Sequence, residues 1–101
     1  MFGLQDKDIN AIRQCFARYQ KIEKVIIYGS RAKGNYKNGS DIDLNIEGDL
    51  DYSTLLKIDN ELDDLLLPYK IDLSLREHIK NPDLIKHIDS VGQIFYSRIG
   101  V

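Results

Sequence analysis

Residues 25–46 read VIIYGSRAKGNYKNGSDIDLNI, and this stretch decides the fold of the chain. It begins with an apolar run that leads directly into Gly29 and Ser30, and a polar loop with two further glycines follows. Acidic and apolar residues then alternate from Asp41 to Leu44. This order predicts two strands that are joined by a turn and a loop.

Asp41 and Asp43 form the first candidate site, because residues i and i+2 of a strand point to the same face. Their backbones should lie roughly 7 Å apart by strand rise, while Ile42 and Leu44 should point into the core. Two carboxylates on one face repel each other, and a bound cation relieves that repulsion. Mg²⁺ suits such a pair, since it commonly binds one or two carboxylates together with substrate phosphates. The alternative is an amphipathic strand whose acidic face lies in water.

A third acid, Asp72, lies in another alternating run, KIDLSL, at residues 70–75. If this run is a strand beside the one that carries Asp41, its carboxylate can share the same face. Three acids around two cations are a familiar arrangement for phosphoryl and nucleotidyl transfer. The alternative is a single exposed aspartate on a strand.

The turn at Gly29 and Ser30 is the second candidate site, for an anion such as a phosphate. Gly29 has no side chain, so a ligand can approach its backbone closely. Ser30 is a favoured helix N-cap, and a helical turn after it would point free N–H groups outward. Arg31 and Lys33 would add positive charge nearby. The alternative is an ordinary strand-to-loop turn, and the lysine and hydroxyl of a Walker A loop are missing.

The rest of the chain predicts an α/β domain with the element order αββαβαβ. The period of the apolar residues and the turn formers between them indicate each element. We expect helices over residues 6–19, 53–66 and 82–91, and strands over residues 23–28, 41–47, 71–75 and 93–98. The helices should pack on one face of a small mixed sheet, and the face that carries the acids should stay open.

Two of these elements carry more specific expectations. Ser53 should cap the helix over residues 53–66, since serine is a favoured N-cap. The strand over residues 23–28 is almost unbroken in apolar residues and should be buried on both faces.

The composition is typical of a single soluble domain over residues 1–101. Hydrophobic residues make up 43% and charged residues 30% of the chain, as in globular proteins. The formal net charge of −2 argues against direct nucleic-acid binding, which favours a basic surface. No apolar run approaches the roughly 20 residues that span a membrane, and no secretory leader is evident. The one cysteine, Cys15, should pack within the first helix, and the cytoplasm is the expected compartment.

The turn and the acids together resemble a known family. The chain resembles the nucleotidyltransferase superfamily that includes DNA polymerase beta. The pattern that carries this resemblance is Gly29 and Ser30, ten intervening residues, then DIDL and the later Asp72. The fuller string, GSRAKG followed by SDIDL, resembles its short bacterial and archaeal members, the minimal nucleotidyltransferases. The resemblance implies the nucleotidyltransferase fold. Asn45 departs from the pattern, where a small or apolar residue is expected, and suggests that this end of the strand lies near a sheet edge.

The resemblance implies a role for each candidate residue. In that family the glycine-serine turn holds a nucleoside triphosphate and three acids hold two divalent ions, Mg²⁺ or alternatively Mn²⁺. The residues that would bind ATP are Gly29, Ser30, Arg31 and Lys33. The residues that would hold the ions and catalyse transfer are Asp41, Asp43 and Asp72, with Asp72 as the base.

The resemblance also implies a partner, a small helical protein of the HEPN class that is encoded adjacently, in a toxin–antitoxin arrangement. This chain would be the antitoxin and would transfer AMP from ATP to a tyrosine of that partner. Larger nucleotidyltransferases bind the acceptor with further domains, for which this sequence has no residues, so a partner or a second subunit of a homodimer would carry it. Two alternatives stay open. One is a non-catalytic protein that neutralises its partner by binding, and the other is a stand-alone enzyme that modifies a small molecule such as an aminoglycoside.

Overall fold

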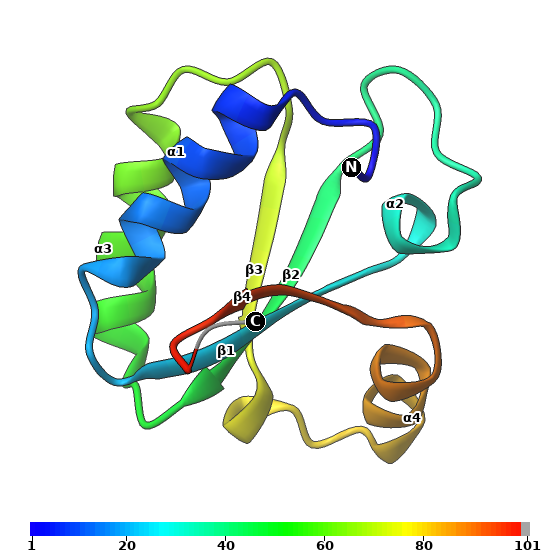
Figure 1. The fold of residues 1–101 in the computed structure, drawn as a ribbon. Helices are drawn as coiled ribbons and strands as arrows, with labels where there is room; N and C mark the ends of the chain where they lie inside the picture. Colours follow the sequence, from blue (N-terminus) through cyan, green and yellow to red (C-terminus); the bar gives the residue numbers. More distant parts are fainter. Residues whose placement is uncertain (100–101) are drawn as a thin grey trace.

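A four-stranded sheet with the order β3-β2-β1-β4 runs through the molecule (Figure 1). The structure is a computed structural model, and it describes residues 1–99. The elements in chain order are α1 (Asp6–Ala17), β1 (Ile22–Tyr28), α2 (Ser30–Lys33), β2 (Ile42–Gly48), α3 (Tyr52–Asp63), β3 (Ile71–Leu75), the 3₁₀ turn η1 (Arg76–His78), α4 (Pro82–Val91) and β4 (Gln93–Ser97). Apart from the two short turns α2 and η1, this is the predicted order.

The sheet is mixed, as predicted. β1 is antiparallel to both of its neighbours, β2 and β4, whereas β2 and β3 run parallel. The parallel pair is made possible by α3, which crosses from the end of β2 back to the start of β3. The predicted α/β fold class is therefore confirmed.

α1 and α3 cover one face of the sheet (Figure 1). Their apolar residues recur at a spacing of three or four and form one buried face on each helix. The core residues of this layer that are 0% exposed are Ile12, Phe16, Ile22, Val25, Ile27, Ile42, Leu44, Ile46 and Ile58. Burial of each such side chain contributes about 1.5–3 kcal/mol relative to exposure, so this layer is the main source of stability. None of the helices within residues 1–99 is long and apolar enough to cross a membrane.

The helix ends differ from the predictions at three places, one of which is the end of α3, at Asp63 rather than at residue 66. Asp51, rather than the expected Ser53, caps α3, because its carboxylate accepts a hydrogen bond of 2.8 Å from the backbone N–H of Thr54. α1 ends at Ala17, two residues before the expected end. α4 begins as predicted, with the Asn81 side chain accepting from the N–H of Asp83 at 2.9 Å, and it ends at Gly92.

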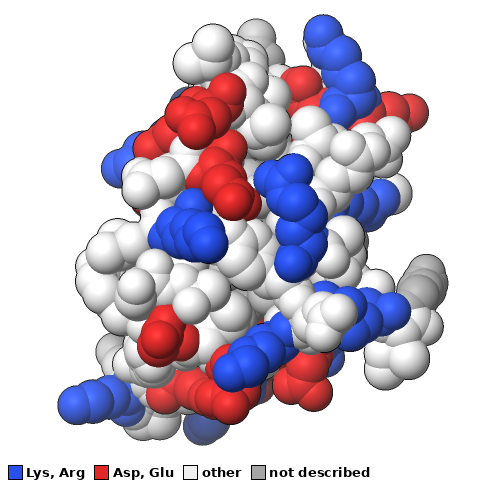
Figure 2. Space-filling view, turned by 90° about the vertical axis from the view of Figure 1, so that its left-hand side faces the viewer, with Lys and Arg blue, Asp and Glu red and all other residues white. Residues whose placement is uncertain are grey.

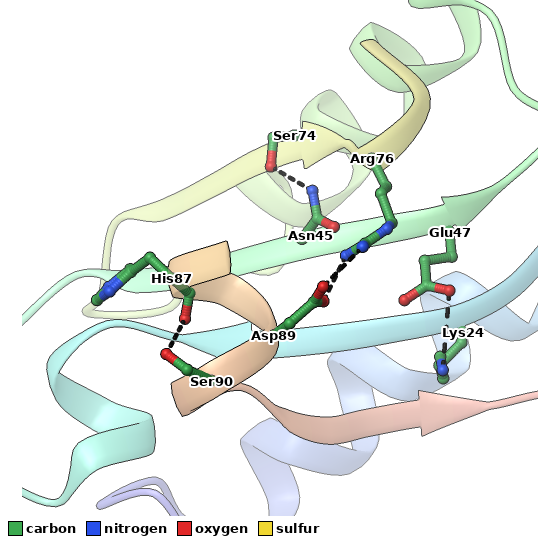
Figure 3. Close-up of polar contacts among 8 residues, drawn as sticks. All are labelled: Lys24, Asn45, Glu47, Ser74, Arg76, His87, Asp89 and Ser90. Carbon is green, nitrogen blue, oxygen red and sulfur yellow. Dashed lines mark hydrogen bonds and ion pairs between the residues drawn. The ribbon is translucent and has the colours of Figure 1, made fainter. Parts of the chain in front are cut away.

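α4 corrects the expectation that the second face of the sheet stays open. It lies on the side of the sheet opposite α1 and α3 (Figure 1) and packs on β1. Gly92 follows this helix and lies so close to Ile26 that a Cβ there would stand 2.4 Å from its Cγ2. Arg76 and Asp89 join η1 to α4 through two hydrogen bonds of 2.7 and 3.0 Å (Figure 3). The second face is therefore covered over β1 and open around the acids.

Two expectations about burial are also wrong. Asn45 lies on the interior strand β2, not near an edge, and is 0% exposed. Its amide nitrogen donates to the hydroxyl of Ser74 on β3 at 2.9 Å (Figure 3), while its amide oxygen is buried with no hydrogen-bond partner among the described residues. β1 is not buried on both faces, because Val25 and Ile27 face the core while Ile26 and Tyr28 are only half-buried on the other side.

Cys15 provides a test of the packing between α1 and α3. Its thiol is 1% exposed and donates to Glu61 of α3 at 3.3 Å. Burial, foremost, and the hydrogen bond to Glu61 raise the pKa of Cys15 to about 11. Since only the thiolate reacts, alkylation by iodoacetamide at pH 8 should be at least about 100-fold slower in the folded protein than in urea. Intact mass spectrometry measures the two rates, and equal rates would contradict this packing.

Candidate active site

The predicted acids meet where β2 and β3 begin. Asp43 of β2 and Asp72 of β3 are direct partners in the parallel ladder, so their side chains point to the same face of the sheet. Asp41 lies immediately before β2 and is exposed. The predicted register of the two alternating runs is therefore found.

Asp43 is the most perturbed of these acids. Burial is the largest cause that raises the pKa of its carboxyl group above the ordinary value, followed by the negative charges of Asp72 and Asp41. The positive charge nearest to Asp72 is Lys70, at 3.8 Å, and both side chains of this pair are well exposed, which makes it weak. The three carboxylates thus keep an unrelieved excess of negative charge that a cation would neutralise.

Gly29 brings the turn into contact with these acids. Tyr28, the last residue of β1, pairs with Asp43 across the antiparallel ladder, so the turn begins beside that carboxylate. Gly29 has φ 76° and ψ −156°, a conformation that is essentially restricted to glycine. A Cβ at this position would stand 2.3 Å from Oδ2 of Asp43. Glycine is therefore required both by the backbone conformation and by the close approach of the carboxylate.

The remaining residues of the predicted nucleotide site differ in exposure, because Lys33 is exposed whereas Arg31 is buried. The predicted helical turn forms as α2, but its N-cap is Gly29 rather than Ser30, which is the first helical residue. Lys33 at the end of α2 is exposed. Arg31 is 3% exposed, and its guanidinium donates to the carbonyl groups of Ser40 at 3.0 Å and Phe2 at 2.9 Å. These contacts tie the loop over residues 34–40 and the N-terminal segment to α2, so the structure uses Arg31 to hold the loop.

Two aromatic rings complete the surroundings of Arg31. Its guanidinium carbon lies 5.3 Å from the ring centre of Tyr36 and 4.9 Å from that of Tyr69. Such cation–π contacts favour a guanidinium that is withdrawn from water. Tyr36 belongs to the loop over residues 34–40, and the contact therefore fixes that loop further.

Sequence reasoning missed a polar row that continues the site along the sheet. Asn45 follows Asp43 by two residues and Ser74 follows Asp72 by two, so they share the face of the acids. The hydroxyl of Tyr28 lies close to Ser74, and burial, foremost, with the charges of Asp43 and Asp72, raises its pKa. The period of two that identified the acids would have identified this row as well.

The acids suit a hard divalent cation by their chemistry, because carboxylate oxygens are the ligands that Mg²⁺ prefers. Within residues 1–99, however, no three His, Cys, Asp or Glu side chains are positioned to hold a metal ion together. Asp43 and Asp72 are in register, whereas Asp41 lies outside the strand. Asp72 already lies close enough to raise the pKa of Asp43, and Asp41 is exposed beside the start of β2, so the donor set fits a divalent cation by its chemistry.

Comparison with known proteins places this geometry in a family. The sequence profile of the family described as "Polymerase beta, Nucleotidyltransferase" matches residues 10–99. A candidate protein adenylyltransferase of Methanocaldococcus jannaschii is 36% identical over 64 residues, which are 62% of this chain and 58% of that protein. A second candidate protein adenylyltransferase of the same organism is 33% identical over 92 residues, 82% of this chain and 93% of its own length.

Solved structures share the fold. A chain of a toxin–antitoxin complex with AMP-PNP superposes with a TM-score of 0.71 at 19% identity, over 93% of this chain and 74% of that one. A chain of the complex of tri-AMPylated Shewanella oneidensis HEPN toxin with MNT antitoxin gives a TM-score of 0.70 at 17% identity, over 95% of this chain and 75% of that one. At such identities the likeness concerns the fold.

Substitution of Gly29 tests the contact between the turn and Asp43. Gly29→Ala should lower the free energy of unfolding by about 2–3 kcal/mol and displace the carboxylate. Gly34→Ala is the matched control, because Gly34 has φ 86° but no atom within 4 Å of its Cβ position. That control should cost about 1 kcal/mol and leave Asp43 in place. Urea unfolding and the ¹³C carboxyl shift of Asp43 measure both effects, and an equal shift in the two variants would contradict the contact.

Proposed function

The chain belongs to the polymerase beta nucleotidyltransferase family, and from this premise we propose that it transfers AMP from ATP to a hydroxyl group of a partner protein. The observation that carries the proposal is the row formed by Gly29, Asp43 and Asp72 at adjacent strand ends. It places the start of α2, whose backbone N–H groups favour an anion, beside paired carboxylates that favour a divalent cation.

The acids are proposed to act in distinct ways. Asp41, Asp43 and Asp72 would hold two Mg²⁺ ions, which neutralise charge on the phosphates and lower the pKa of a bound hydroxyl when present. Asp72, on the more open strand, accepts the proton of the acceptor hydroxyl. The acceptor oxygen then forms a bond to the α-phosphorus of ATP. The bond between the α-phosphorus and the oxygen that bridges it to the β-phosphorus breaks, and pyrophosphate leaves.

The turn is proposed to hold the leaving group. The backbone N–H groups at the start of α2 and the hydroxyl of Ser30 would donate to the β- and γ-phosphates. Lys33 is exposed and free to reach a phosphate oxygen. Arg31 supports the turn through the loop over residues 34–40, since its donors are directed to backbone carbonyl groups.

The proposed acceptor is a tyrosine of a HEPN-type partner that is encoded adjacently, with this chain as the antitoxin. Two observations support this. The structural neighbours include complexes of a toxin with an antitoxin, one of them with an AMPylated HEPN toxin, and the relatives are candidate protein adenylyltransferases.

The face of α1 and α3 carries acidic and basic side chains side by side (Figure 2), which does not favour nucleic acid. The reaction would take place in the cytoplasm, where ATP is available.

A second candidate function is neutralisation of the partner by binding alone. It is favoured by one observation, that no three acidic or other ligating side chains of the described chain are already arranged around a metal position. On this reading the acids would bind Mg²⁺ weakly or not at all. The complex with the partner would form without any transfer of AMP.

Asp43→Asn separates the two candidates. The variant should lose at least about 100-fold in the rate of AMP transfer and keep its fold, because the neutral amide removes a charge that the folded state disfavours. Asp49→Asn is the matched control on an exposed acid outside the site. The measurement is intact mass of the co-expressed neighbour after addition of ATP and Mg²⁺. AMP transfer at the full rate by Asp43→Asn would contradict the assignment of the site. Suppression of the neighbour's activity without AMP transfer would establish the binding function.

Removal of the metal gives an independent test. EDTA should abolish AMP transfer, and Mg²⁺ or Mn²⁺ should restore it. At a free concentration ten times its dissociation constant, Mg²⁺ should stabilise the wild-type protein by about 1.4 kcal/mol. It should stabilise neither Asp43→Asn nor Asp72→Asn. Thermal unfolding at constant ionic strength, with K⁺ as the control ion, measures this stabilisation. An equal stabilisation of all three proteins by Mg²⁺ would contradict a metal site at these acids.

A further inference from the structure

The outer edge of β3 is unpaired. β3 is the end strand of the sheet and pairs with β2 alone. The carbonyl group of Lys70, the residue before β3, accepts a hydrogen bond of 2.8 Å from the N–H of Ile42 of β2. Alternation along the strand therefore turns the backbone groups of Ile71 and Leu73 outward. No other segment among residues 1–99 pairs with this edge. A second polypeptide segment in the extended conformation can therefore pair with this edge and add a strand to the sheet.

A groove of about 430 Å³ runs beside this edge, between β3 and α3. Its apolar wall includes two large side chains of α3, Tyr52 with 61% and Leu56 with 47% of their surface exposed. Large apolar side chains that lie exposed next to a free strand edge are typical of a binding surface. Asp72 stands at the rim of the groove, so the groove leads to the candidate active site.

The groove is negatively charged. Asp59 and Asp63 of α3 line it together with Asp72, and the one basic residue among the described residues that line it is Lys70. Lys70 already lies 3.8 Å from Asp72. Burial, foremost, and then the charges of Asp63 and Asp72 raise the pKa of Asp59, as expected for carboxylates that repel one another. This charge disfavours a nucleic acid and favours a basic polypeptide.

We propose that the edge of β3 and its groove are the docking surface for the acceptor, an extended basic segment of the partner protein that adds a strand and brings its tyrosine to Asp72. The inference rests on the proposed function and names the substrate of that site. An added strand would lie about 4.8 Å from β3. Its alternate side chains would stand about 5 Å from Asp72 on the face of the acids, and those between would fall on Tyr52 and Leu56.

Binding of short peptides to the full chain tests the docking surface. The probe is the fluorescein-labelled peptide KVKVYKKVK. Tyrosine and four lysines share the face toward Asp72, and the face toward α3 carries three valines and one lysine for Asp59 and Asp63. EVEVYEEVE is its acidic counterpart. By fluorescence anisotropy, the basic peptide should bind at least about tenfold more tightly than the acidic one. N-methylation of alternate residues of the basic peptide should abolish binding, because it removes the donors that pair with β3.

Variants locate the bound peptide. Asp63→Lys and Leu56→Asn, both at exposed positions of α3, should each weaken binding of the basic peptide by about tenfold. Ile94→Asn is the matched control, because Ile94 is 54% exposed on β4, the other edge of the sheet, and this variant should bind like wild type. No binding of the basic peptide, equal binding of the acidic one, or an equal loss in Ile94→Asn would overturn the docking proposal.

The same assay separates failure of docking from failure of catalysis. With ATP and Mg²⁺, wild type should add AMP to the bound peptide, whereas Asp43→Asn should bind it equally and add none. In AMP transfer to the whole partner, Asp63→Lys should raise KM with kcat unchanged. A peptide that binds in the groove but accepts no AMP contradicts the proposed function alone. Transfer to the partner that Asp63→Lys leaves unaltered contradicts the docking surface alone.

Discussion

The register of the three strands β1, β2 and β3 is the constraint on which the rest of this structure depends. It sets Tyr28, Asp43 and Asp72 in one row across the sheet, and it places Gly29 directly against the carboxylate of Asp43. Because side chains alternate along a strand, a slip of one residue would turn both acids into the core and their apolar neighbours into water. The site therefore exists only in this pairing, and the pairing is held by the apolar residues between the acids.

Those apolar residues explain how a stable domain can keep like charges together. Ile42, Leu44 and Ile46 of β2 are fully buried beneath α1 and α3, on the face opposite the acids. Their burial supplies several kcal/mol and offsets the burial and the like charges that raise the pKa of Asp43. The fold thus holds the carboxylates in a state that they would not adopt by themselves, and such a state favours the binding of a cation.

The face of the acids is divided into a covered and an open part. α4 covers β1, and the pair Arg76 and Asp89 fastens it to η1 (Figure 3). Toward the beginning of β3 the face is open around the acids and the turn at Gly29, and Asp72 also lines the groove between β3 and α3. The open part is where the proposed nucleotide and acceptor would bind.

The sequence by itself determined the elements, their order, and the face that Asp43 and Asp72 share, because these follow from the period of two in a strand and from local turn chemistry. It did not determine what each face meets. The interior position of Asn45, the placement of α4 over β1 and the burial of Arg31 beneath Tyr36 and Tyr69 were decided by the tertiary structure. Burial and strand neighbours depend on contacts between residues far apart in the chain, and a local pattern carries no record of them.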